Sequence, residues 1–261
     1  MLLEGKNAVV YGAGGSVGGA VARAFAREGA AVFLAGRTLA PLRAVAEDIV
    51  RAGGAAEAAV VNALDEGAVR RHADAVAASA GSLDVSFNAI SVDHIQGVPL
   101  ADMSEQDVVR PIAERVATHL LTARAAARHM TAQGHGVIIT FTADAARLAY
   151  AEVGSFGVAC AAVEGLTRSL AAELGPSGVR VICLRSMGSP DAPDVEAVWK
   201  LRAAEENPSS RSVFAARSAL TLLDRLPTLP EVGNVAALMA SDDASPLTAA
   251  VINVTCGEIA D

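Results

Sequence analysis

The chain alternates short apolar runs of strand length with longer stretches in which apolar residues recur at helical spacing. The apolar runs predict strands at residues 7–11, 31–34, 58–61, 83–88, 136–142, 179–184 and 249–254. The helical spacing predicts helices at residues 17–28, 39–52, 65–80, 105–133 and 155–174. Strands that alternate with helices of this length form a parallel sheet with helices on both faces.

This pattern predicts one doubly wound, Rossmann-like α/β domain that extends over residues 1–261 and has about seven strands. The ligand of such a fold lies beyond the carboxyl ends of the strands, where the strand order reverses. Residues 185–234 are rich in Ser, Pro and Asp and indicate a loose region. Within it we expect a substrate flap at about residues 186–230 and a helix at 194–205 that contains Trp199.

Composition narrows the classes of function. The chain has 261 residues, 52% of them apolar, and a formal net charge of -8. That charge argues against a nucleic-acid partner, because binding the phosphate backbone requires a basic surface. No apolar run approaches the ~18 residues of a membrane helix, and residues 1–10 lack the order of a signal peptide. The three cysteines are too widely spaced for a disulfide framework or a metal site. We therefore expect a cytoplasmic protein without a metal.

A glycine-rich loop from Gly12 to Gly19 follows the first expected strand and opens the first expected helix. Glycine tolerates positive φ and lets the backbone approach a ligand closely, and a helix N-terminus presents free N–H groups. A strand, a loop and a helix in this order predict a site for the pyrophosphate of a dinucleotide. The alternative is a tight turn that only packs the helix onto the sheet.

The end of the second expected strand bears on the choice of cofactor. An acidic residue there would hydrogen-bond the ribose hydroxyls of NAD, but the sequence reads Gly36-Arg37-Thr38. Arg37 can pair with a 2′-phosphate, and Thr38 can add a hydroxyl group. The sequence therefore favours NADP(H) over NAD(H). The alternative for Arg37 is a solvated side chain at the start of a helix.

These motifs together resemble the short-chain dehydrogenase/reductase family, and the resemblance extends over almost the whole chain. The opening motif of the family appears here with Ser16 in place of its middle glycine, a change associated with enoyl reductase-like branches. Residues 161–171 are typical of the active-site helix of the family, and residues 230–254 are typical of its C-terminal end. The resemblance implies the Rossmann-like fold that the hydrophobic pattern also predicts.

The resemblance also implies a set of residues that contact the cofactor. These are Gly12, Gly14, Gly15, Ser16, Val17, Gly18, Arg37, Thr38, Asn62, Ala63, Asn88, Ala89, Ile90, Ser186 and Gly188. Three of these segments depart from the family pattern. Asn62 stands where the family has Asp, Ile90 stands where it has Gly, and Ser186 begins a segment that replaces its Pro-Gly.

The polar residues that perform catalysis in this family are absent from the matching positions. The family uses a Tyr as proton donor, a Lys that lowers the Tyr pKa, a Ser that polarises the substrate and an Asn that holds a water. The matching positions hold Phe156, Cys160, Ala143 and, within a few residues, Arg115. The only lysines, Lys6 and Lys200, lie far from these positions, so no shift of the alignment restores the pair. The resemblance therefore indicates a divergent member, in which Cys160 is expected to be an inert buried thiol.

Two other residues are candidates for the proton donor. Tyr150 follows the fifth expected strand, and Arg115 or Arg147 is the expected cation that would lower its pKa. His94 follows the fourth expected strand and belongs to the residue type that titrates near neutral pH. For both residues the alternative is a side chain exposed on a loop. Asp144 is expected to cap its own loop.

Three functions remain open at this point. The first is an atypical NADP(H)-dependent oxidoreductase that reduces a carbonyl or an activated alkene, with a proton from Tyr150, His94 or solvent. The second is a pseudoenzyme that binds a cofactor or a partner without catalysis. The third is a non-redox lyase, isomerase or cyclase that uses the same pocket for a small molecule. The resemblance also implies a homodimer or homotetramer assembled through the helices at 105–133 and 155–174.

Overall fold

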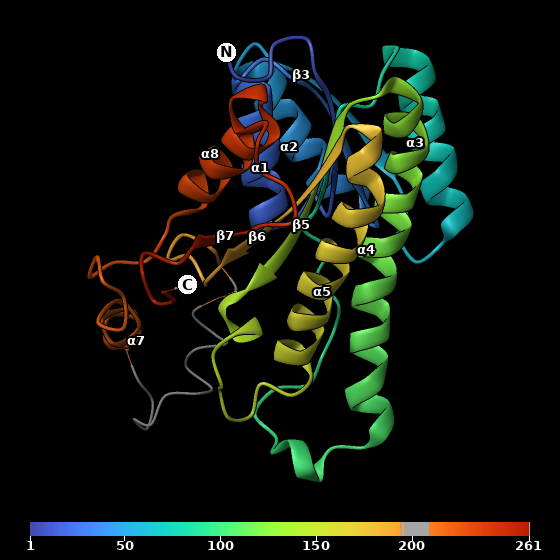
Figure 1. The fold of residues 1–261 in the computed structure, drawn as a ribbon. Coiled ribbons are helices and arrows are strands. Elements are labelled where there is room, and N and C mark those ends of the chain that lie inside the picture. Colours follow the sequence, from blue (N-terminus) through green and yellow to red (C-terminus); the bar gives the residue numbers. More distant parts are fainter. Residues whose placement is uncertain (194, 196–208, 261) are drawn as a thin grey trace.

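A seven-stranded parallel sheet forms the centre of the molecule in the computed structural model, which describes residues 1–193, 195 and 209–260 (Figure 1). The strand order is β3-β2-β1-β4-β5-β6-β7. The strands are β1 Asn7–Tyr11, β2 Ala31–Gly36, β3 Ala55–Val60, β4 Val85–Asn88, β5 Gly136–Ala143, β6 Val179–Ser186 and β7 Val251–Val254. The prediction of a doubly wound, Rossmann-like sheet is confirmed.

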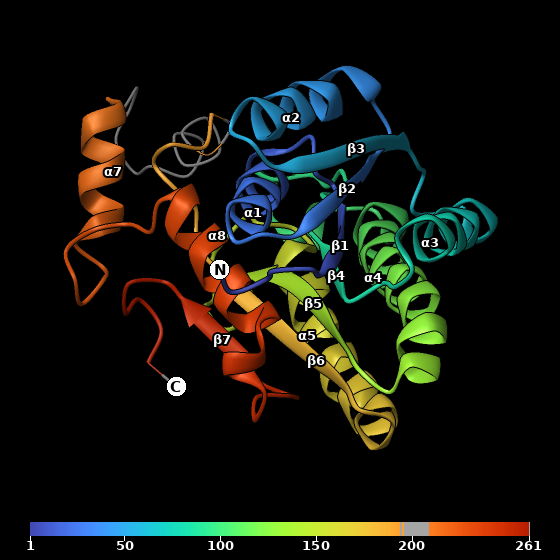
Figure 2. The same cartoon turned by 90° about the horizontal axis from the view of Figure 1, so that it is seen from above.

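Helices cover both faces of the sheet (Figure 2). One layer contains α1 Ser16–Arg27, α2 Leu39–Arg51 and α8 Leu229–Ala240, and the other contains α3 Glu66–Ala80, α4 Glu105–Gln133 and α5 Phe156–Leu174. Val9 and Val10 of β1 are both fully buried, yet they belong to the apolar cores on opposite faces. The strands are therefore apolar on both sides, as a parallel sheet between two helical layers requires.

The segment before β7 is more regular than its composition suggests. The prediction of a loose region through residue 234 is wrong, because α7 Ser210–Ser218 and α8 form within it. A capping box begins α8: the Thr228 hydroxyl accepts from the Glu231 N–H, and the Glu231 carboxylate accepts from the Thr228 N–H at 2.8 Å. Pro230 lies in the first turn, where its missing N–H costs nothing. The expected helix around Trp199 lies outside the described residues.

The strand order places a crevice at the carboxyl ends of β1 and β4. The chain leaves β1 toward β2 on one side, while β4 pairs with β1 on the other side, so the connections diverge here. A ligand site is expected at such a switch point. Among the described helices, none combines the length and the apolar character needed to cross a bilayer.

Candidate active site

The glycine-rich loop after β1 lies close to the backbone that follows β4. Gly12 has a φ of +77°, and a Cβ on it would lie 2.8 Å from the Ala89 carbonyl oxygen at the end of β4. A Cβ on Gly18 would collide with the Gly12 carbonyl. The following helix α1 starts after Gly15 with no side-chain cap and no acidic residue in its first turn. The N–H groups of that turn are therefore available to an anion.

A cavity of about 250 Å³ lies beside this loop and gathers the ends of four strands. Seven of the residues expected to contact a cofactor line it: Gly12, Gly15, Arg37, Asn62, Ala63, Ala89 and Ile90. Arg37 is exposed at this cavity, and its guanidinium makes no ion pair with the described residues. The close approach of the glycines, the uncapped helix and this cation fit a dinucleotide that carries phosphates.

The other residues expected to contact a cofactor lie in different surroundings. Gly14 and Ser16 line a second hollow, on the α8 side of the loop, and Val17 packs against the core that includes α1 and α8. Gly18 packs against Gly12, Thr38 precedes α2, and Gly188 lies in the segment after β6.

Two of the expected contacts, Asn88 and Ser186, use their polar groups within the protein. The Asn88 side chain accepts from the Ile90 N–H at 2.9 Å and donates to the Thr122 hydroxyl at 2.9 Å. The Ser186 hydroxyl donates to the Val254 carbonyl at 3.1 Å. These bonds hold the loops that follow β4 and β6.

The four positions that the resemblance assigns to the catalytic set lie near one another. Cys160 lies one turn after Phe156 on α5, and the backbone of Ala143 at the end of β5 lies beside the Cys160 thiol. The guanidinium carbon of Arg115, on α4, lies 5.2 Å from the centre of the Phe156 ring. Burial raises the pKa of the Cys160 thiol, which keeps it neutral.

His94 lies against the same phenylalanine. Its ring stacks on the Phe156 ring at a centroid separation of 4.8 Å and an interplanar angle of 10°. The His94 Nδ1 donates to the Val92 carbonyl at 2.9 Å, and Nε2 faces the side-chain amide of Gln96. The half-buried ring is held by contacts and is not a freely exposed loop side chain.

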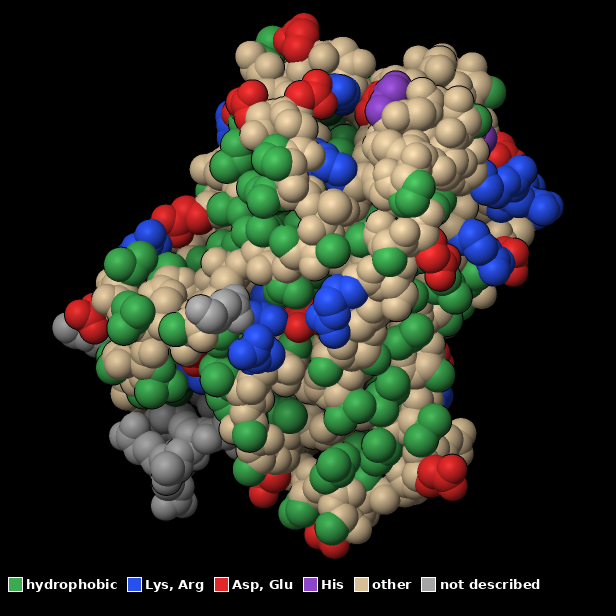
Figure 3. Space-filling view, in the orientation of Figure 1, with side chains coloured by type: hydrophobic (Ala, Val, Ile, Leu, Met, Phe, Trp, Pro, Cys, Tyr) green, Lys and Arg blue, Asp and Glu red, His purple; other side chains and the backbone are tan. Residues whose placement is uncertain are grey.

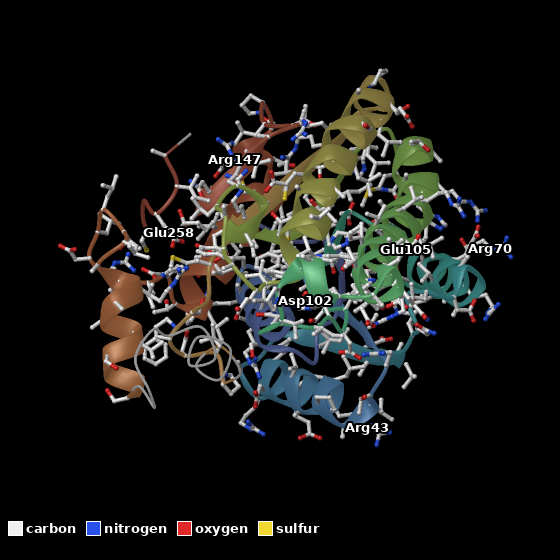
Figure 4. All side chains as sticks on the ribbon, turned by 90° about the horizontal axis from the view of Figure 1, so that it is seen from below. Arg43, Arg70, Asp102, Glu105, Arg147 and Glu258 are labelled. Atoms are coloured by element: carbon white, nitrogen blue, oxygen red, sulfur yellow. The ribbon has the colours of Figure 1, made fainter. Side chains whose placement is uncertain are left out.

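Tyr150 belongs to a buried polar cluster. Its hydroxyl lies 2.9 Å from Asp144 Oδ2 and 3.1 Å from Glu258 Oε1. Arg217 of α7 lies 2.8 Å from the Asp144 oxygen and 2.9 Å from the Glu258 oxygen. Figure 4 views the molecule from the carboxyl ends of the strands and shows Glu258 on the side where α7 lies. We call these four residues the Arg217 cluster.

The cluster changes two expectations from the sequence. The cation beside Tyr150 is Arg217, and the expectation of Arg115 or Arg147 in that role is wrong. Burial and the charge of Asp144 outweigh this cation and raise the pKa of Tyr150, which makes the phenol a poorer acid at neutral pH. Asp144 caps its loop by accepting from the Ala145 N–H, as expected, but it also forms the ion pair.

Sequence reasoning missed three residues of this region: Arg217, Glu258 and His119. Arg217 and Glu258 reach Asp144 from segments far along the chain, and no local pattern marks them. His119 lies one turn after Arg115, and its Nδ1 contacts the Arg115 carbonyl at 2.9 Å. Burial and the nearby guanidinium lower the pKa of His119 to about 3, so the imidazole is neutral.

Comparison with known proteins identifies relatives over nearly the whole chain. A family model described as Enoyl-(Acyl carrier protein) reductase matches residues 12–258. Cis-4-hydroxycyclohexanecarboxylate dehydrogenase of Sinomonas cyclohexanicum is 33% identical over 253 residues, which are 96% of this chain and 95% of that protein. Short-chain reductase protein NovJ of Streptomyces niveus is 30% identical over 250 residues, 96% of this chain and 92% of that protein.

Solved structures show the same architecture. A short-chain type dehydrogenase/reductase from Mycobacterium ulcerans superposes with a TM-score of 0.89 and 26% identity, and covers 99% of this chain and 91% of its own. NAD+-bound xylitol dehydrogenase superposes with a TM-score of 0.91 at 23% identity, and covers 98% of this chain and 100% of its own. The second likeness concerns the fold alone.

Proposed function

The chain belongs to the short-chain dehydrogenase/reductase family, and from this membership we propose that it is an NADP(H)-dependent oxidoreductase that reduces a carbonyl or an activated alkene without a Tyr-Lys pair. The observation that supports it most is the crevice at the β1–β4 switch point, with its uncapped helix and with Arg37 at the cavity. Relatives of this chain named D-threitol dehydrogenase and cis-4-hydroxycyclohexanecarboxylate dehydrogenase support an oxidoreductase. The expected substrate flap at about residues 186–230 includes residues 194 and 196–208, which lie outside the described residues, and in this proposal its described parts border the substrate.

The preference for NADP(H) rests on the end of β2. Arg37 is the cation at the cavity, and no acidic residue stands between Gly36 and the start of α2 to repel a 2′-phosphate. The N–H groups at the start of α1 would hold the pyrophosphate. When bound, the reduced nicotinamide supplies a hydride to the substrate carbon.

Side chains must then stabilise the negative charge that develops on the substrate and supply a proton to it. Arg115 gives a positive charge beside Phe156 and Cys160, in the place where relatives of this family have their Tyr and Lys. His94 against Phe156, or water, delivers the proton, because the raised pKa of Tyr150 disfavours it as the acid. Positioning and preorganised charge account for the remaining acceleration.

Calorimetric titration with NADPH and NADH tests the cofactor site. We expect NADPH to bind more tightly, and Arg37→Ala to weaken NADPH on the order of tenfold to a hundredfold, as loss of charged hydrogen bonds does, without affecting NADH. Arg43→Ala is the matched control, since Arg43 is also an exposed arginine of this region, on α2 (Figure 4). Failure of both nucleotides to bind the wild-type protein would contradict the proposal.

One observation favours a second function, a pseudoenzyme that binds cofactor without turnover. Two titratable groups near Arg115 are the Cys160 thiol, whose pKa is raised, and the neutral buried imidazole of His119, and neither is a ready acid at neutral pH. Deuterium transfer from labelled NADPH to a panel of ketones and aldehydes separates the two functions. Transfer to any of them supports the reductase, whereas tight binding without transfer supports the pseudoenzyme.

A further inference from the structure

We propose that Arg115 binds a carboxylate, and that the substrate of this site is a small carboxylic acid whose carboxylate lies next to the reacting carbon. The description of the anion as a substrate rests on the proposed reductase function. The anion site itself follows from the surroundings of Arg115 alone. These surroundings are a buried cation, carboxylates engaged elsewhere, neutral neighbours and an adjoining cavity.

The Arg115 guanidinium is largely buried, stacks on the Phe156 ring and has no counter-ion among the described residues. The residue is 6% exposed, its Nε lacks a hydrogen-bond partner, and its side chain forms no ion pair with the residues that the structure describes. Arginine keeps its proton at any pH that a protein experiences, so the charge cannot be lost by titration. A buried cation without a counter-ion is strongly unfavourable. A bound anion would remove this cost.

Three carboxylates on the surrounding elements are already engaged. Each of the three is held by another arginine: Glu164 by Arg185 at 2.8 Å, Asp144 by Arg217 at 2.8 Å, and Glu114 by Arg110 at 3.0 Å. Glu164 is held at both oxygens, since its second oxygen accepts from Arg185 at 2.9 Å. None of these ion pairs includes Arg115. The anion for Arg115 must therefore come from outside the described part of the chain.

Three neutral groups lie near Arg115. They are the Phe156 ring, the buried Cys160 thiol and the uncharged His119 imidazole, one turn away on α4. An anion that reaches the guanidinium would therefore be bound in apolar surroundings, where a charged hydrogen bond is stronger than in water. The stacked rings of Phe156 and His94 add a flat wall against which a planar substrate can pack.

The site adjoins the cofactor cavity. Glu114 and Thr118, which flank Arg115 along α4, line that cavity, and so does Val92, two residues before His94. Arg115 and Thr118 share one helix face, because they are three residues apart. A small acid in this cavity would therefore lie beside Arg115 and near the expected reaction centre.

A carboxylate fits better than a phosphate. The planar guanidinium matches the two oxygens of a carboxylate, and one cation balances one negative charge. A phosphate dianion would need a second cation, but the neighbouring Arg110 and Arg217 are already paired. Arg37 lies at the end of β2 and is assigned to the cofactor in the proposed function.

The test compares three probes of similar size on the full chain without any nucleotide: benzoate, benzamide and phenyl phosphate. Calorimetric titration should show benzoate binding at least tenfold more tightly than either other probe. Arg115→Gln should weaken benzoate on the order of tenfold to a hundredfold and leave benzamide unchanged, as loss of charged hydrogen bonds predicts. Arg110→Gln, on the same helix but exposed and paired, is the control and should change neither.

Two measurements on the wild-type protein test the proposal even if Arg115→Gln does not fold. Benzoate should raise the Tm of the wild-type protein more than benzamide does, and its ring protons should show nuclear Overhauser contacts with Phe156. Equal binding of benzoate and benzamide, tighter binding of phenyl phosphate, or absence of the Phe156 contact would each overturn the carboxylate site.

The outcome also separates this inference from the proposed function. If benzoate binds through Arg115 but no oxo acid, neutral carbonyl or activated alkene oxidises NADPH, the anion site stands and the reductase proposal fails. If 2-oxo acids are reduced by NADPH at a rate that Arg115→Gln leaves unchanged, the reductase stands and the carboxylate substrate is refuted.

Discussion

Arg115, which is buried, and Arg217, which is partly buried, have opposite surroundings. Arg217 lies between Asp144 and Glu258 and stacks over the Tyr150 ring, so its charge is more than balanced. Arg115 forms no ion pair with the described residues, and its Nε lacks a hydrogen-bond partner. A buried ion pair holds the elements that carry its two partners together. A buried charge without a counter-ion indicates a candidate ligand-binding site. The contrast separates the structural cluster from the candidate binding site.

Glu258 should make stability depend on pH. Burial and the nearby Asp144 raise its pKa to about 7, from 4.5 in the unfolded chain. Between these values the folded state binds more protons, so stability falls as pH rises from about 4.5 to about 7, and this contribution is absent above that range. We expect the wild-type protein to lose on the order of 1–3 kcal/mol over this range relative to Glu258→Gln.

Urea unfolding of the wild-type protein and Glu258→Gln at several pH values measures this difference. Glu173→Gln, an exposed glutamate on α5, is the matched control and should reproduce the wild-type curve. Parallel curves for the wild-type protein and Glu258→Gln would show that Glu258 titrates normally.

At the scale of elements, α7 is joined to the described part of the fold by a small apolar core and by an ion cluster. Its Val213 packs with Met187 and Leu226 in a small apolar core that is separate from the two large ones. Its Arg217 joins the helix to the end of β5 and to the C-terminal segment through Asp144 and Glu258. A helix held this way is stabilised by one buried ion cluster more than by its own apolar face.

Arg217→Met should therefore loosen α7. The substitution keeps much of the side-chain volume but leaves two buried carboxylates without their cation, which costs about 3 kcal/mol in comparable pairs. We expect faster hydrogen exchange in α7 and in residues 255–260, with the central strands unchanged. Arg225→Met is the control, because its pair with Glu231 is exposed and should leave the exchange of α7 as it is. Unchanged exchange in the Arg217 variant would show that the apolar contacts alone hold the helix.

At the scale of the whole molecule, the outer face of α4 and α5 is the surface expected for self-association. The two helices pack against each other, and hydrophobic side chains gather on this face (Figure 3). Val109 of α4 and Val158 of α5 are each about half exposed. Apolar groups exposed on adjacent helices favour burial against a second copy.

We expect a homodimer or homotetramer in solution. Val158→Glu should shift the mass measured by light scattering toward the monomer, because a charge would be buried at the interface. Val50→Glu is the control, since Val50 is similarly exposed but lies on α2, in the opposite helical layer. A wild-type monomer at high concentration, or a mass insensitive to Val158→Glu, would refute this expectation.

The sequence by itself determined the architecture and the glycine-rich loop. The alternation of strand and helix lengths predicts the sheet, and the loop at Gly12 follows from residues adjacent in the chain. Such features are local, so period and composition reveal them. The start of α8 was missed because its capping box lies in a stretch whose Ser and Pro content suggests a loop.

Only the tertiary structure decided which charges meet. Arg115 reaches Phe156 across the α4–α5 contact, and Arg217 reaches Asp144 and Glu258 across three separate segments. Neither pairing has a sequence period, because the partners are brought together by the packing of the sheet and its helices. Whether a carboxylate neutralises a buried arginine depends on the distance between the two groups, and in low-dielectric surroundings a few ångströms decide it. For that reason the candidate site for an anion emerged from the fold and not from the motif.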